Sequence, residues 1–134
     1  MEIVHSFPPN IASIKSILPI TEDNIFTYGS NLYVPSGHEI PPDIMIHEKV
    51  HSDRQMDFNG AENWWKLYLT DTSFRLEEEL LAYATQLKWV HEHLNAKAYK
   101  MALDEFASNL QTLYSISITF QKAQTLIRSK EKQL

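Results

Sequence analysis

The residues best suited to chemistry are two histidines and a glutamate in the motif His47-Glu48-Lys49-Val50-His51. On an α-helix, residues i and i+4 lie one turn apart on one face, so both imidazoles can bind one metal ion at about 2.0–2.1 Å. Glu48 projects about 100° further round the helix, where it can act as general base and acid toward water activated by the ion. A shuffled chain of this composition contains the motif only about 0.02 times, so the motif predicts a zinc site.

A catalytic zinc takes three protein ligands and leaves one position open, so a third ligand is needed. The acidic run Glu77-Glu78-Glu79 lies near the start of a predicted helix. Helical phase places Glu79 at the rim of the apolar face, Glu77 on the other flank and Glu78 toward solvent. Glu79 therefore fits best and Glu77 second. The alternative is that all three form a charged first turn favoured by the helix dipole.

Other possible ligands are weaker by the same reasoning. Asp57 stands six residues after His51, where some zinc motifs place a third ligand. Such motifs turn the chain at a glycine, but Arg54 occupies that position here and keeps the helix going, so Asp57 should not reach the ion. We expect the remaining histidines to be ordinary surface or packed side chains: His5, His38, His91 and His93.

The elements that must position this site change character near residue 42. All six prolines and two of the three glycines lie before residue 43. The β-prone runs 25–28 and 32–34, separated by Gly29-Ser30-Asn31, predict a hairpin. Residues 3–7 are a candidate third strand. The apolar spacing of residues 11–18 fits a helix or a strand equally well.

Beyond residue 43 the pattern is helical. Pro41-Pro42-Asp43 is a helix start, because proline fixes φ and the acid lies near the positive end of the dipole. Predicted helices cover residues 43–58, 61–69, 74–94, 97–110 and 119–130. We therefore predict an α+β fold, mainly helical, in a single metallopeptidase-like domain over residues 1–134. Its β-rich part, 1–42, packs on the motif helix within the helical part, 43–134.

Composition excludes several classes of function. The formal charge is −5, so the basic face that nucleic acid requires is missing. There are no cysteines, so any metal must use His, Asp or Glu. The N-terminal residues lack the basic and apolar regions of a signal peptide, and no apolar run has the length of a membrane span. We expect a cytoplasmic protein with no membrane partner.

Several segments together resemble a known group of enzymes. They are Tyr28-Gly29-x-x-Leu32-Tyr33-Val34-Pro35, Ile46-His47-Glu48-x-x-His51 with Gln55, Trp64-Trp65-Lys66-x-Tyr68-Leu69-x-Asp71, Phe74-Arg75-x-x-x-Glu79-x-x-Ala82-Tyr83, Phe106-Ala107-x-x-Leu110-x-x-x-Tyr114 and Thr119-x-x-x-Ala123. This pattern, over roughly residues 25 to 125, resembles small phage-encoded zinc metallopeptidases, similar in plan to the minimal gluzincins.

The resemblance implies a short sheet packed on the HExxH helix and a second helix that supplies the third ligand, Glu79. It implies that an edge strand beside the site pairs with an extended substrate, here Leu32, Tyr33 and Val34. It also implies the host cytoplasm as the location. The extra histidine that gluzincins use on the oxyanion has no clear match. The open candidates for a hydroxyl in that role are Tyr33, Tyr68, Tyr83 and Tyr114.

We therefore expect a zinc-dependent peptidase acting on a peptide or protein substrate. His47, His51 and Glu79 would hold Zn²⁺, and Glu48 would be the general base. The alternative is a non-catalytic, zinc-stabilised interaction or structural protein on the same fold, such as a phage assembly component. The small size of the chain and the missing oxyanion histidine favour that alternative.

Overall fold

The computed structural model describes all residues, 1–134, and confirms a mainly helical α+β fold with a small sheet. The strands are β1 (Glu2–Val4), β2 (Phe26–Tyr28) and β3 (Asn31–Tyr33). The helices are α1 (Ile11–Lys15), α2 (Pro42–Asp57), α3 (Ala61–Thr70), α4 (Thr72–His93), α5 (Ala96–Thr112) and α6 (Phe120–Lys132). The stretch whose spacing fitted helix or strand is thus a short helix, α1.

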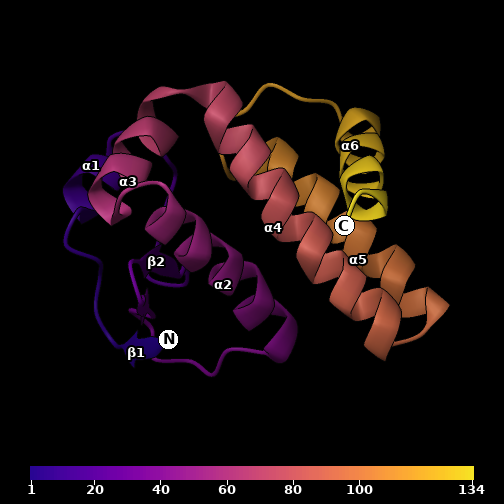
Figure 1. The fold of residues 1–134 in the computed structure, drawn as a ribbon, viewed down its shortest axis with the longest axis horizontal. Coiled ribbons are helices and arrows are strands. Elements are labelled where there is room, and N and C mark those ends of the chain that lie inside the picture. Colours follow the sequence, from indigo (N-terminus) through magenta and orange to yellow (C-terminus); the bar gives the residue numbers. More distant parts are fainter.

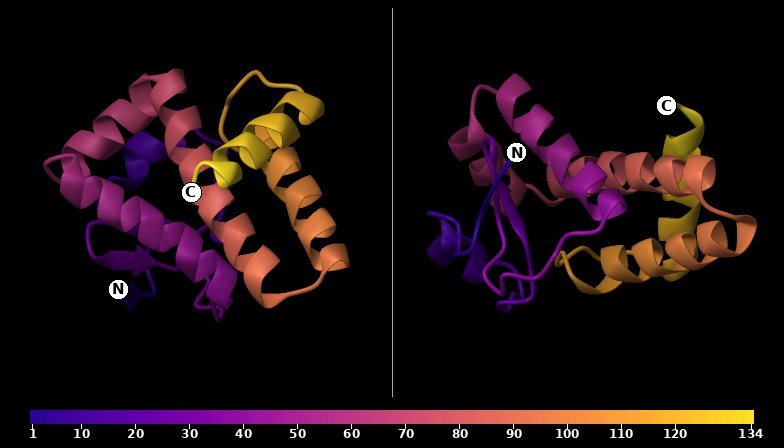
Figure 2. Two further views of the ribbon diagram at one scale, coloured as in Figure 1. Left: turned by 45° about the vertical axis from the view of Figure 1, so that its right-hand side comes forward. Right: turned by 90° about the horizontal axis from the view of Figure 1, so that it is seen from below.

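Helix α4 runs through the middle of the molecule (Figure 1). It packs against α2 and α3 on one side and against α5 and α6 on the other. The sheet lies beyond α2, and β2 is the strand that contacts it. Figure 2 shows the same division from two further directions, with the N-terminal part and the α5–α6 pair at opposite ends. None of the helices has the length and apolar character that crossing a bilayer requires.

The sheet has the strand order β1-β3-β2, which corrects one prediction. β3 pairs with β2 in antiparallel register and with β1 in parallel register, so it is the middle strand. The prediction that Leu32, Tyr33 and Val34 form a substrate-binding edge is therefore wrong. Leu32 and Val34 are fully buried. The side of β3 expected to be free is taken by the first residues of the chain.

Local signals set the ends of the two site helices. α2 starts at Pro42 with Asp43 in its first turn, as predicted. It stops where Asn59 and Gly60 adopt positive φ angles of 67° and 109°, a backbone conformation that ends a helix. α4 is capped by Asp71, whose side chain accepts from the backbone N–H of Phe74 at 3.1 Å.

Two apolar clusters flank α4 and α2. The bundle core joins α4, α5 and α6 and consists of Leu80, Tyr83, Leu87, Leu103, Phe106, Ala107, Leu110, Ala123 and Ile127. The sheet-side core joins α1, β2 and α3 and consists of Ile14, Leu18, Phe26, Trp64, Trp65, Tyr68 and Leu69. Between them lies a set of buried polar side chains that we call the polar seam: Thr27, His47, Glu48, His51, Ser52, Gln55, Arg75, Glu78, Glu79 and Gln86.

Candidate metal centre

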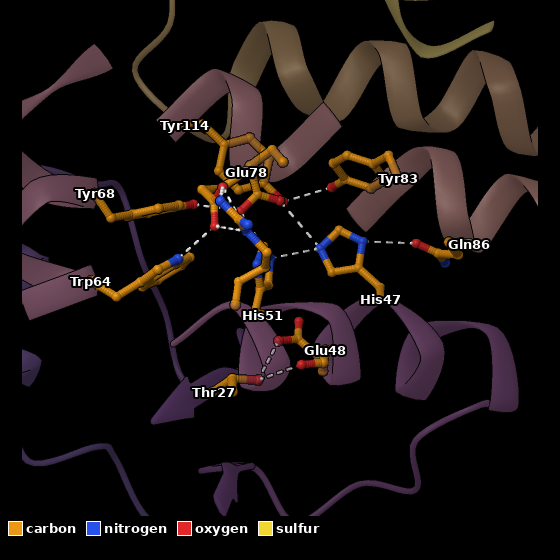
Figure 3. Close-up of polar contacts among 12 residues, drawn as sticks. Thr27, His47, Glu48, His51, Trp64, Tyr68, Glu78, Tyr83, Gln86 and Tyr114 are labelled. Atoms are coloured by element: carbon orange, nitrogen blue, oxygen red, sulfur yellow. Dashed lines mark hydrogen bonds and ion pairs between the residues drawn. The ribbon is translucent and has the colours of Figure 1, made fainter. Parts of the chain in front are cut away.

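His47, His51 and Glu79 meet in the polar seam, and all three are buried. Figure 3 shows the two histidines next to each other. Nε2 of His47 lies 3.2 Å from Oε1 of Glu79, and Nε2 of His51 lies 3.1 Å from Oε2. The two Nε2 atoms are 3.2 Å apart. The structure thus brings together the three residues that the sequence predicted as ligands.

The elements explain why these side chains converge. His47 and His51 lie one turn apart on the face of α2 that packs against α4. Glu79 lies in the second turn of α4 and faces back toward α2. Because both helices are fixed by other contacts, the ligand atoms are held on rigid elements rather than on loops.

Charge in the cluster is strongly perturbed. Burial disfavours a charge on His51, but the Glu79 carboxylate outweighs burial and raises the pKa of His51 to about 9. Burial disfavours the Glu79 carboxylate as well, but His51 and His47 outweigh it and lower the pKa of Glu79. Glu79 is therefore an anion, the form in which a carboxylate binds a cation.

The spacing of the three donors fits a small tetrahedral ion. Metal–ligand distances of about 2.0–2.1 Å imply ligand–ligand separations of about 3.3–3.4 Å in a tetrahedron. The two Nε2 atoms are 3.2 Å apart, and each lies 3.1–3.2 Å from a different oxygen of the Glu79 carboxylate. Two imidazole nitrogens and one carboxylate oxygen are also the donor set of catalytic zinc sites. The chain can therefore hold a metal ion at this point.

The surroundings of His47 support the same conclusion. Nδ1 of His47 lies 3.0 Å from Oε1 of Gln86, and Nε2 of Gln86 donates to Oδ2 of Asp43 at 2.8 Å. The Asp43 carboxylate only accepts, so the amide oxygen of Gln86 must face His47. A neutral imidazole has one N–H, and in this arrangement it is the Nδ1–H, which donates to Oε1 of Gln86. Nε2 of His47 then faces Glu79 with a lone pair, an arrangement that a metal ion between them would satisfy.

His51 and Glu79 have different neighbours. Nδ1 of His51 is buried without a hydrogen-bond partner, and its ring packs against Trp64 at a centroid distance of 5.3 Å. The Tyr68 hydroxyl donates to Oε2 of Glu79 at 2.6 Å. Burial, together with the Glu79 carboxylate, raises the pKa of Tyr68 well above its usual value, so this hydroxyl keeps its proton.

Glu48, the predicted general base, lies beside the cluster and is only 8% exposed. Thr27 on β2 donates to its Oε2 at 2.7 Å, whereas Oε1 has no hydrogen-bond partner (Figure 3). Gln55 fixes β2 against α2, because its side chain bonds the carbonyl of Thr27 and the N–H of Gly29. Through these contacts the edge strand β2, rather than β3, borders the site.

The other two glutamates of the acidic run behave differently from each other. Glu77 is exposed and lies 3.6 Å from Lys130, so it is no ligand. The prediction that Glu78 points to solvent is wrong, because Glu78 is 3% exposed. It pairs with Arg54 at 2.9 Å and accepts from Nε1 of Trp64 at 2.7 Å. These partners come from α2 and α3, so phase on a single helix cannot reveal them.

Residues judged unsuitable as ligands do lie outside the cluster. Asp57 is exposed at the end of α2. The four remaining histidines are exposed as well: His5, His38, His91 and His93. The group that could hold a metal ion therefore consists of two histidines and one glutamate.

Two hollows meet at the cluster. A cavity of about 100 Å³ has the three ligands on one wall and apolar side chains such as Leu18 and Trp65 on the other. An open cleft of about 530 Å³ runs past the other side. His47, Glu48 and Tyr114 line both hollows.

The four candidate tyrosines differ in position and in what their hydroxyls contact. Tyr33 lines neither hollow, and Tyr68 uses its hydroxyl on Glu79. The hydroxyls of Tyr83 and Tyr114 lie 2.6 Å apart. One proton of this pair is used between the two oxygens, so the other remains available for a third group.

Three residues of the site were not expected from the sequence: Gln86, Asp43 and Thr27. A usable signal existed for Gln86, which lies seven residues after Glu79 and so two turns along the same helix face. No local signal pointed to Thr27, because its contact with Glu48 depends on how the hairpin docks on α2.

Comparisons of this chain with protein families, with curated proteins and with solved structures gave no match.

Proposed function

We propose that this chain is a zinc-dependent peptidase. The observation that carries the proposal is the convergence of two Nε2 atoms and one carboxylate at 3.1–3.2 Å, with the free oxygen of Glu48 at the same cavity. Zinc is favoured over calcium or magnesium, because those ions prefer all-oxygen sites. The helix bearing Glu48 and His47 is the arrangement expected of a metal-assisted hydrolase.

The residues have separate roles in such a reaction. A zinc ion bound here supplies Lewis acidity, which activates water and polarises a peptide carbonyl. Glu48 accepts the proton of the attacking water at Oε1, since Thr27 occupies Oε2, and then delivers it to the leaving amine. The Tyr83–Tyr114 pair can donate its remaining proton to the developing oxyanion from the edge of both hollows.

The substitution Glu48→Gln tests this proposal. We expect one zinc per chain in both proteins by elemental analysis, and a loss of peptide cleavage of about 10²–10⁴-fold in the variant, the usual contribution of a general base. The matched control is Glu62→Gln, which changes an exposed glutamate on α3. Cleavage by Glu48→Gln at the parent rate would rule out the mechanism.

A second candidate is a zinc-stabilised interaction protein without catalysis. The low exposure of the site favours it: His47 is 5% exposed and Glu48 8%, with Leu18 and Tyr114 beside them. This candidate predicts that a chelator lowers the melting temperature while a peptide library stays uncut. Cleavage of any library member that depends on Glu48 decides for the peptidase.

A further inference from the structure

We propose that Asp43 and Gln86 form a relay that sets which nitrogen of His47 carries its proton, and so presents the Nε2 lone pair to a metal ion. The relay runs from the first turn of α2 to the middle of α4 and back to His47. This inference rests on the proposed metal-binding function and adds two positioning residues that lie outside the ligand set.

The direction of the relay follows from its fixed end. Oδ2 of Asp43 accepts from Nε2 of Gln86 at 2.8 Å, and a carboxylate has no proton to donate in return. Oε1 of Gln86 therefore lies 3.0 Å from Nδ1 of His47 as an acceptor. A proton on Nδ1 makes this contact a hydrogen bond. A proton on Nε2 alone would place two lone pairs against each other at Nδ1. A lone pair on Nε2 instead faces the Glu79 carboxylate, where a bound metal ion would lie between the two.

Burial gives the relay its strength. Gln86 is only 4% exposed, so its amide has few alternative partners in water. An unpaired polar group at such a position loses its hydrogen bond to water without replacement, which favours the arrangement that satisfies both ends of the amide. The relay also orients the imidazole ring, since the Nδ1 contact fixes its rotation about the Cβ–Cγ bond.

A neutral amide has an advantage next to this cluster. Glu79 and Glu48 already place two carboxylates around the histidines. Asp43 orients the amide dipole of Gln86, and the amide oxygen faces His47, so no third anion lies beside the ligands. Gln86 lies at Nδ1 of His47 (Figure 3) and Glu79 at Nε2, so the imidazole is held between an acceptor and the ligand cluster.

His51 provides an internal contrast. Its Nδ1 is buried with no hydrogen-bond partner, so the contact with Glu79 at Nε2 and packing against Trp64 orient that ring. The relay is therefore a property of one ligand and not of every histidine in the motif. Losing it should affect metal affinity through His47 while leaving the fold intact.

The test is the substitution Gln86→Leu, which keeps the size of the side chain and removes the acceptor. We expect zinc affinity, measured by competition with a chromogenic chelator, to fall about 10–100-fold, the usual effect of losing such a partner. The control is Gln124→Leu, because Gln124 also donates to an aspartate, Asp104 at 2.7 Å, but far from any ligand. That control should bind zinc as the parent does.

A double substitution tests the polarity of the relay. In Asp43→Asn with Gln86→Glu, the new carboxylate at position 86 still accepts from Nδ1 of His47, and the new amide at position 43 donates to it. We expect this protein to recover most of the affinity lost in Gln86→Leu. A side chain that merely fills space would not show this recovery.

A measurement without metal separates this inference from the proposed function. The ¹⁵N chemical shifts of the His47 ring in the zinc-free parent should show a proton on Nδ1. If the parent takes up no zinc, the proposed function fails, but the ¹⁵N shifts of His47 still show whether Nδ1 carries the proton. Undiminished zinc affinity of Gln86→Leu, or an Nδ1 without a proton in the parent, would overturn the relay. If Gln86→Leu does not fold, the double substitution and the parent spectrum decide.

Discussion

Helix α4 contributes to two buried regions of opposite character. One face supplies Leu80 and Leu87 to the bundle core, where every member except Tyr83 has a side chain of hydrocarbon only. The other face supplies Glu78, Glu79 and Gln86 to the polar seam against α2. Both regions are shielded from water to a similar degree. They differ in what their burial achieves.

Burial of hydrocarbon stabilises a fold by about 25 cal/mol per Å² of apolar surface. Burial of ionisable groups does not, because replacing such a network with apolar side chains is often neutral or stabilising. The bundle core is therefore explained by folding alone. The seam holds five ionisable groups from HExxH and the α4 acids. It is explained by the metal ion that three of them could hold. One face of α4 therefore serves stability, and the other carries groups that could hold a metal ion.

The largest expected effect on stability comes from the bundle core. Ile127 is fully buried on α6, so Ile127→Ala should lower the free energy of unfolding by about 2–5 kcal/mol, with Ile127→Val at about 0.5–1.5 kcal/mol. Urea denaturation measures both, with the exposed Ser129→Ala as control. The loss should be equal with zinc and with chelator, because the sites are independent. A loss of stability that depends on zinc would contradict the independence of the bundle core and the polar seam.

The next effect comes from metal removal. At a free zinc concentration of 100 times Kd, the parent should gain about 2.7 kcal/mol over its metal-free form. The same comparison in His51→Ala should show almost no gain, because a ligand is missing. Thermal unfolding with zinc or with chelator measures the difference. Equal melting temperatures for the parent with zinc and with chelator would contradict the proposal that the polar seam binds zinc.

A third test compares two adjacent glutamates on α4. Glu78→Gln should cost about 1–2 kcal/mol, because it removes the charge that pairs with the partly exposed Arg54 while leaving an acceptor for Trp64. Glu77→Gln should change stability by less than about 0.5 kcal/mol, since Glu77 is exposed. Chemical denaturation of the pair measures the contrast. Similar losses would show that Glu78 acts as a surface charge after all.

These residues also show what the sequence could predict. The spacing of His47 and His51 and the phase of Glu79 are properties of single helices, so the ligand set could be inferred before the structure. The buried position of Glu78 could not, because its partners belong to α2 and α3. The middle position of β3 could not either, since it depends on parallel pairing with residues at the start of the chain.

The smallest effect concerns pH at the rim of the bundle. Partial burial and a hydrogen bond to Glu131 at 2.7 Å raise the pKa of Tyr99 to about 12. The folded protein then holds this proton at a pH where the unfolded chain has lost it. Tyr99 therefore contributes stability that is complete below about pH 10 and is lost as the pH rises through about 12.

The substitution Tyr99→Phe isolates this contribution. The difference in unfolding free energy between parent and variant should shrink from pH 9 to pH 12. The effect is small because Tyr99 is only partly buried and solvent screens its charge. A difference that grows with pH would reverse the sign of this linkage. A difference that shrinks with pH would assign the pH dependence to Tyr99 at the rim of the bundle and not to the apolar side chains of its core.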